Sequence, residues 1–167
     1  MKHLLYISIF LTFTFSNCKI KYSLNGAAIP IEAKTVSVAY FVNNTTLGNA
    51  SISQKFTERL KDVISTQTNL ALMKQNGDLQ FEGSITGYNI APVAIQVNDR
   101  AALNRLTITV KVKYTNKFDA TKNFEQDFTN FENFESTQAI SSVEDVLLKE
   151  IYRKITEDIF NKAFNNW

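Results

Sequence analysis

An uninterrupted two-residue alternation over residues 105–114 constrains the fold of this chain more than any other feature of its sequence. The apolar positions are Leu106, Ile108, Val110, Val112 and Tyr114, and the polar positions between them are Arg105, Thr107, Thr109, Lys111 and Lys113. Successive side chains of a β-strand point to opposite faces of the sheet. One face of this strand is therefore predicted to lie in a core, and the other to face water.

Three further segments have the patterns of strands. Residues 35–42 are rich in β-branched and aromatic side chains, and residues 79–86 alternate between apolar and polar. The segment "NFEQDFTNFENF", residues 123–134, fits a helix about as well as a strand with a bulge. We favour the strand, because Asn, Asp and Thr are poor helix formers and the preceding "KFDATK" is typical of a hairpin connection.

Two segments have helical periodicity. The first is predicted over residues 52–66, where Ser51 and Gln54 form a capping box before an apolar stripe of Ile52, Phe56, Leu60, Val63 and Ile64. The second follows a similar signature at Ser141 and Glu144, and its stripe recurs at four-residue steps through Val143, Leu147, Ile151, Ile155, Ile159 and Ala163. We predict a long C-terminal helix from this stripe.

The order of elements is thus β-α-β-β-β-α. Strands with one apolar face and helices with one apolar stripe pack most economically as two layers. We predict an α+β two-layer sandwich, in which a mostly antiparallel four-stranded sheet carries both helices on one face. The chain is 44% hydrophobic, which suffices for one core, so residues 35–167 are predicted to form a single domain.

The N-terminus has the features of a secretory signal over residues 1–17. A short basic start precedes an apolar run from Leu4 to Phe15, which is shorter than the roughly 20 residues that a membrane-spanning helix needs. The only cysteine, Cys18, follows directly.

The segment "FSNC" is similar to the lipobox of bacterial lipoproteins, in which the cysteine becomes the first mature residue and is acylated. Phe15 and Asn17 depart from the usual residues of that motif. The resemblance implies a lipid anchor on Cys18, since more than one acyl chain holds a protein firmly at a membrane. Residues 18–34 are then predicted to be a lipidated tether; the alternative is ordinary export with an incidental thiol.

The composition of the mature chain excludes several classes of function. Without residues 1–17 it has 17 basic and 16 acidic side chains and no histidine. This balance does not favour nucleic-acid binding. Histidine-dependent triads and the usual zinc sites are excluded, and no cofactor or metal is predicted. The carboxylate pairs Glu132 with Glu135 and Glu144 with Asp145 leave a small envelope enzyme as a minor hypothesis.

The long connection over residues 89–104 is a candidate partner-contact segment, because long connections in compact domains are often functional. It contains Val93, Ile95 and Val97, next to a Pro92 that is unsuited to a central strand. The alternative is that this segment extends the second strand along an edge of the sheet.

The sequence resembles the LPS-assembly lipoprotein (LptE) family. The segments that carry the resemblance are "FSNC", "VSVAYFVN", "DLQFEGSITGYNI", "NRLTITVKVKYTN" and "NFEQDFTNFENF". The resemblance implies a non-catalytic, lipid-anchored protein on the periplasmic side of the outer membrane. Its expected partners are an LptD-like β-barrel, whose lumen it plugs and whose assembly it supports, and lipopolysaccharide on its way to the outer leaflet.

Lipopolysaccharide carries phosphates, which fixed cations can hold. The candidate cations are Lys111, Lys113, Arg100 and Arg105. The alternative is that they solvate an exposed surface. A competing function is that of a subunit of another envelope secretion or surface-fibre channel, because fold does not fix function.

Overall fold

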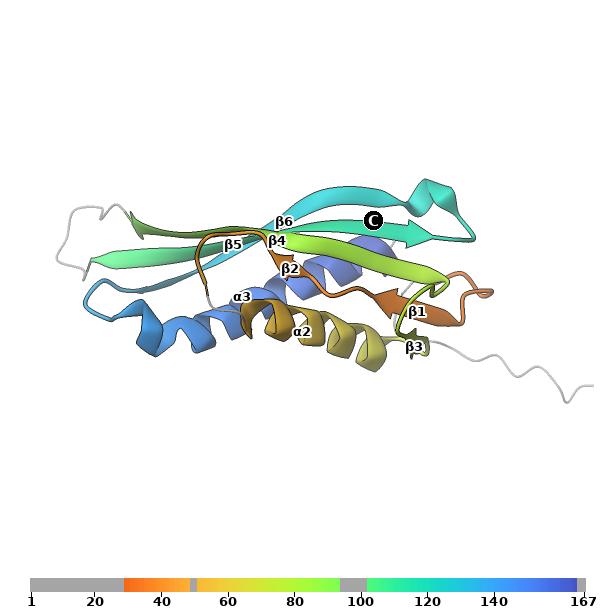
Figure 1. The fold of residues 1–167 in the computed structure, drawn as a ribbon, viewed down its shortest axis with the longest axis horizontal. Helices are drawn as coiled ribbons and strands as arrows, with labels where there is room; N and C mark the ends of the chain where they lie inside the picture. Colours follow the sequence, from red (N-terminus) through yellow and green to blue (C-terminus); the bar gives the residue numbers. More distant parts are fainter. Residues whose placement is uncertain (1–28, 49–50, 94–101, 165–167) are drawn as a thin grey trace, which may run out of the picture.

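The computed structural model describes residues 29–48, 51–93 and 102–164, and shows a sheet covered on one face by two helices (Figure 1). The elements are β1 (Thr35–Val38), β2 (Val42–Asn43), α2 (Ser51–Gln67), β3 (Ala71–Met73), β4 (Leu79–Val93), β5 (Leu103–Asn116), a 3₁₀ turn η1 (Ala120–Lys122), β6 (Phe124–Glu135) and α3 (Ile140–Phe164). The predicted α+β sandwich is confirmed, and the sheet of the described residues has six strands where four were predicted.

The sheet combines a long antiparallel part with a short parallel part. Its strand order is β3-β1-β4-β5-β6, and β2 pairs with β4 beyond the end of β1. The pairs β4–β5 and β5–β6 are antiparallel, whereas β1, β2 and β3 join their neighbours in parallel. Because α2 crosses over between β2 and β3, the parallel pairing has the connection that it requires.

The first predicted strand, residues 35–42, is interrupted in the middle. Val38 pairs with Phe81 and Val42 pairs with Ser84, so four steps along this strand match three steps along β4. The extra residue has the effect of a bulge, which re-aims a side chain. Phe41 is thereby fully buried, and its N–H donates to Thr57 Oγ1 of α2 at 3.1 Å. The interruption therefore fixes α2 against the sheet.

The core lies between the sheet and the helices. The inner side chains of β5 from Leu106 to Val112 are fully buried, as the alternation predicts. An aromatic cluster closes the core near the end of α3, where the ring of Phe81 lies 4.9 Å from Tyr114 and 6.0 Å from Phe164. Residues from β4, β5 and α3 thus share one core.

The two helices match their predicted stripes. All five residues of the first predicted stripe are buried in α2, and Leu147, Ile151, Ile155 and Ile159 are buried in α3. The boundaries differ slightly, since α3 begins at Ile140, one residue before the Ser141 of the predicted capping box. Residues 123–134 form a strand as predicted, whereas β3 was not predicted.

Candidate functional site on the open face of the sheet

The face of β4, β5 and β6 that points away from the helices is the candidate functional site, and we call it the open face. The register places Thr107, Thr109, Lys111 and Lys113 of β5 on it, because their neighbours in the strand are buried. Thr109 Oγ1 lies 2.9 Å from Thr129 Oγ1 of β6. Hydroxyls and charged groups therefore share this surface.

Both predicted lysines of β5 are in ion pairs across strands. Lys111 Nζ lies 2.8 Å from Glu125 Oε1, and Lys113 Nζ lies 3.6 Å from Glu82 Oε2. The hydrogen bond from Lys111 lowers the pKa of Glu125 and raises the pKa of Lys111 itself. Asp127 stands directly opposite Lys111, so two lysines face three carboxylates. An anion that binds here must therefore compete with these carboxylates.

Arg105 forms a second group nearer the opposite end of β5. Its guanidinium carbon lies 3.8 Å from the centre of the Phe131 ring, and Nε donates to Asn133 Oδ1 at 3.0 Å. Phe131 is 42% exposed, and this stacking holds the cation of Arg105 in place. Among the residues that the structure describes, no carboxylate forms an ion pair with Arg105. The sequence analysis identified Arg105 as a candidate but not Phe131, although the side chains of both residues point to the open face from adjacent strands.

The long connection is only partly described. β4 continues to Val93, which pairs with Leu103 and is half-buried, and Pro92 pairs with Asn104. Along this stretch the described strands pair with β4 on one side only, so the proline lies at an edge as its missing N–H requires. Ile95, Val97 and Arg100 lie outside the described residues, as does Cys18.

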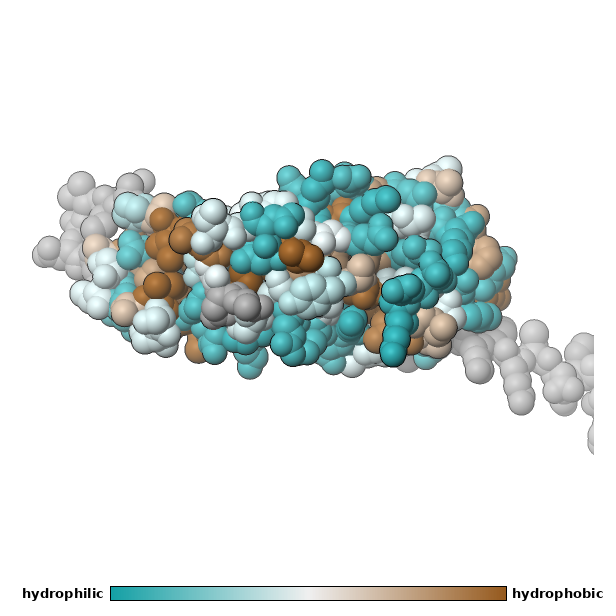
Figure 2. Space-filling model, viewed as in Figure 1, coloured by the Kyte–Doolittle hydropathy of each residue, from teal (hydrophilic) through white to brown (hydrophobic). Residues whose placement is uncertain are grey.

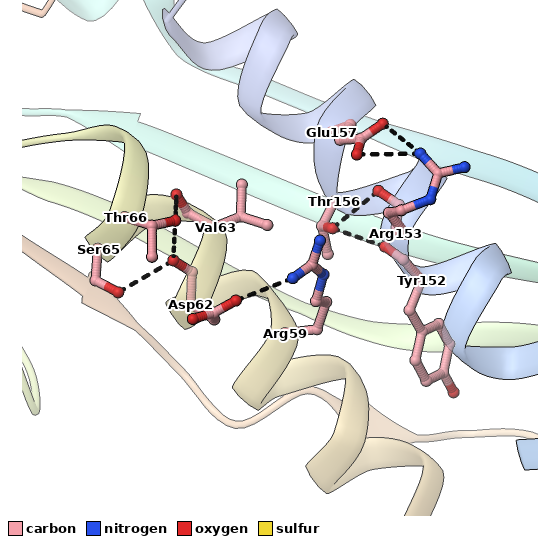
Figure 3. A network of polar contacts seen from close by, with 9 residues as sticks. All are labelled: Arg59, Asp62, Val63, Ser65, Thr66, Tyr152, Arg153, Thr156 and Glu157. Atoms are coloured by element: carbon pink, nitrogen blue, oxygen red, sulfur yellow. Dashed lines mark hydrogen bonds and ion pairs between the residues drawn. The ribbon is translucent and has the colours of Figure 1, made fainter. Parts of the chain in front are cut away.

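On the other layer, the charged residues of the helices are paired mainly within each helix (Figure 3). Arg59 reaches Asp62 at 2.9 Å in α2, and Arg153 reaches Glu157 at 3.0 Å in α3. Between the helices lies a groove of about 290 Å³, with buried Leu148 on its floor.

The fold separates the partners of the two carboxylate pairs that a small envelope enzyme would need. Glu132 and Glu135 are three positions apart in β6 and so point to opposite faces, and Glu132 pairs with Lys154 at 2.6 Å. Glu144 accepts a hydrogen bond from Tyr88 at 2.7 Å, whereas Asp145 pairs with Lys55. Burial, and this bond to Glu144, raise the pKa of Tyr88.

Two further properties concern the described residues alone. They contain no cluster of three or more metal-ligating side chains. Among them, neither helix has the length and apolarity to cross a bilayer.

Comparison with known protein families finds a family model that matches most of this chain. The model of the LptE lipopolysaccharide-assembly family matches residues 33–163. No curated protein matches this chain.

Solved structures share the fold at low identity. A minor lipoprotein from Acinetobacter baumannii is 11% identical, with a TM-score of 0.50 over 80% of this chain and 92% of that one. The hypothetical protein CT253 from Chlamydia trachomatis is 9% identical, with a TM-score of 0.53 over 80% of this chain and 99% of that one. At these identities the likeness shows the fold alone.

Proposed function

Because the chain belongs to the LptE family of lipopolysaccharide-assembly proteins, we propose that it is an outer-membrane lipoprotein that plugs an LptD-like β-barrel. It supports assembly of that barrel and assists insertion of lipopolysaccharide into the outer leaflet. The observation that carries this proposal is the family match, which spans every described strand, all of α2 and all of α3 except its last residue. The role is non-catalytic and needs neither cofactor nor metal.

The surface of the domain supports this role. The lumen of a large barrel is polar, so a plug should have mixed charge and little net charge. The mature chain meets this condition with 17 basic and 16 acidic side chains. The open face is built the same way, since its lysines alternate with carboxylates and its centre carries threonines. Such a surface can form hydrogen bonds with a polar wall at several points.

We further propose that the open face and the β4–β5 end contact the partners. Lys111, Lys113, Arg105 and Arg100 are the candidate ligands for lipopolysaccharide phosphates, and Val93, Ile95 and Val97 the candidate contacts to the barrel wall. Arg105 is best suited among the described cations, because it is stacked on Phe131 while Lys111 and Lys113 already have carboxylate partners. Cys18 is the site of lipidation, and residues 18–34 are the tether.

Affinity purification of the tagged lipoprotein from detergent-solubilised envelopes tests the proposed function. A large barrel protein should copurify in stoichiometric amount. Recovery of the protein alone would count against the plug. A closed ring of identical subunits would instead favour the competing function of a secretion or surface-fibre channel subunit.

The contact at the β4–β5 end has its own test in the same purification. Deletion of residues 92–97 should reduce the yield of the barrel while the shortened protein still folds. Undiminished yield would remove this segment from the proposed contacts.

A further inference from the structure

The end of the domain at which the described chain begins is built from three segments that are far apart in the sequence. Asp78 accepts hydrogen bonds from the N–H groups of Lys34 and Thr35, each at 3.0 Å. Lys117 Nζ donates to the carbonyl of Asn76 at 2.9 Å. Residues 31–35, 71–78 and 116–122 therefore form one surface, which we call the entry end; it lies at the right of Figure 1.

The entry end exposes large apolar side chains on all three of its segments. Ile31 is 82% exposed, and Leu72, Met73 and Phe118 are each close to half exposed. Phe118 sits at a turn that Asn116 braces by accepting hydrogen bonds from two N–H groups. In Figure 2 this end shows hydrophobic residues mixed with hydrophilic ones. Ile31 and Phe118 lie on loops, and Leu72 and Met73 lie on the edge strand β3. Exposed apolar side chains that gather at one end of a domain are typical of an interaction surface.

Lysines accompany these apolar side chains. Lys34, Lys74, Lys117 and Lys122 are all exposed at this end. The ammonium groups of Lys34 and Lys117 donate to main-chain carbonyls, and within the described chain Lys34, Lys74 and Lys117 form no ion pair. Of the carboxylates here, Asp78 and Asp119 accept hydrogen bonds from main-chain N–H groups, and Glu32 is exposed. Basic and apolar groups together are typical of a surface that meets lipid headgroups.

The short sequence distance between Cys18 and the entry end indicates that this end meets a lipid surface. Eleven residue steps separate Cys18 from Ile29, the first described residue, and Ile29 packs against the core. Eleven extended residues reach at most about 40 Å. An acylated Cys18 would therefore hold the entry end close to the bilayer, at a high effective concentration of lipid.

We propose that the entry end docks on the lipid surface, with Ile31 and Phe118 entering the headgroup region, the exposed edge strand β3 with Leu72 and Met73 lying beside them, and the lysines contacting lipid phosphates. This rests on the lipid anchor of the proposed function. The elongated domain in Figure 1 then points its opposite end, where β4 ends and α3 begins, away from the anchor. The tether and the docking surface together orient the plug.

Fluorescence quenching in the lipidated protein tests this docking. Trp167, the only tryptophan, is replaced by Phe, and a single probe is introduced as F118W or, for the matched control, as V146W. Val146 is 68% exposed near the beginning of α3, at the opposite end. In vesicles that contain brominated phospholipid, F118W should lose emission and V146W should not. Equal emission from both probes, or a blue-shifted but unquenched F118W buried against protein, would overturn the proposal.

A second measurement makes the result independent of the anchor. The mature chain with Cys18→Ala should cosediment with vesicles that contain phosphatidylglycerol more than with phosphatidylcholine alone. The variant K34Q/K74Q/K117Q should weaken this partitioning about fivefold for each lysine removed. Partitioning that is indifferent to these lysines and to L72S/M73S/F118S would contradict docking. Failure of the barrel to copurify would bear on the proposed function alone, because neither measurement contains the barrel.

Discussion

The two faces of β5 differ in almost every physical respect although they belong to one strand. On the inner face, Ile108 and Val110 are fully buried against the helices. On the open face, Lys111 pairs with Glu125 and Thr109 Oγ1 lies beside Thr129 Oγ1 of the neighbouring strand, and the ion pairs there are about half exposed. Burial of apolar area stabilises the domain, whereas exposed ion pairs contribute little. The inner face thus stabilises the fold, whereas the open face contributes little to its stability.

Phe81→Ala should have the largest effect on stability, because it removes a fully buried ring that packs on Tyr114 and Phe164. We expect a loss of about 3–5 kcal/mol. Urea denaturation followed by circular dichroism measures it. A loss no larger than that of an open-face variant such as Thr129→Ala would contradict the claim that the inner face stabilises the fold more than the open face.

Gly83→Ala tests a close approach within the sheet. A Cβ at this position would lie 2.0 Å from the carbonyl oxygen of Lys111 and 2.6 Å from the ring of Phe41. The backbone of β5 cannot move away without losing its pairing, so we expect a loss of about 1–3 kcal/mol. Thermal unfolding would show this as a lower Tm. An unchanged Tm would mean that the register of β4 and β5 is different.

Asp78→Asn should change stability in a pH-dependent way. Hydrogen bonds from the N–H of Lys34 and the side chain of Thr35 lower the pKa of Asp78 below its ordinary value of 3.8. A lowered carboxyl pKa stabilises the folded state above the ordinary value, and that contribution disappears as the pH falls through the folded-state value. The difference between wild type and D78N should therefore be present at neutral pH and vanish in acid. A difference that persists in acid would contradict this origin.

K111Q/K113Q should have the smallest effect on stability, since both lysines are exposed. If these residues hold lipopolysaccharide phosphates, the variant should bind lipopolysaccharide more weakly while its unfolding curve stays unchanged. K55Q/K149Q on the helix layer is the matched control. Equal binding by both variants would exclude Lys111 and Lys113 from phosphate recognition. Arg105 and Arg100 would then be the candidate cations that remain.

Local patterns predicted much of this fold because they record burial directly. The alternation from Leu106 to Tyr114 fixed which side of β5 is buried, and the stripes of both helices marked the residues that meet the sheet. The strand over residues 123–134 was also predictable, although its spacing was ambiguous, because its Asn, Asp and Thr residues disfavour a helix.

Non-local pairing could not be predicted in the same way. β3 has three exposed residues and exists only because β1 lies beside it. The interruption at Phe41 depends on the register with β4 and on Thr57 in α2. On the open face, the lysine positions were evident from the sequence, but their pairing with Glu125 and Glu82 required knowledge of which strands are neighbours.

Depletion of this protein in growing cells, with quantification of lipopolysaccharide at the cell surface, tests the central claim most directly. A plug that assists export predicts that lipopolysaccharide accumulates short of the surface as the protein disappears. A normal surface level after depletion would contradict the account.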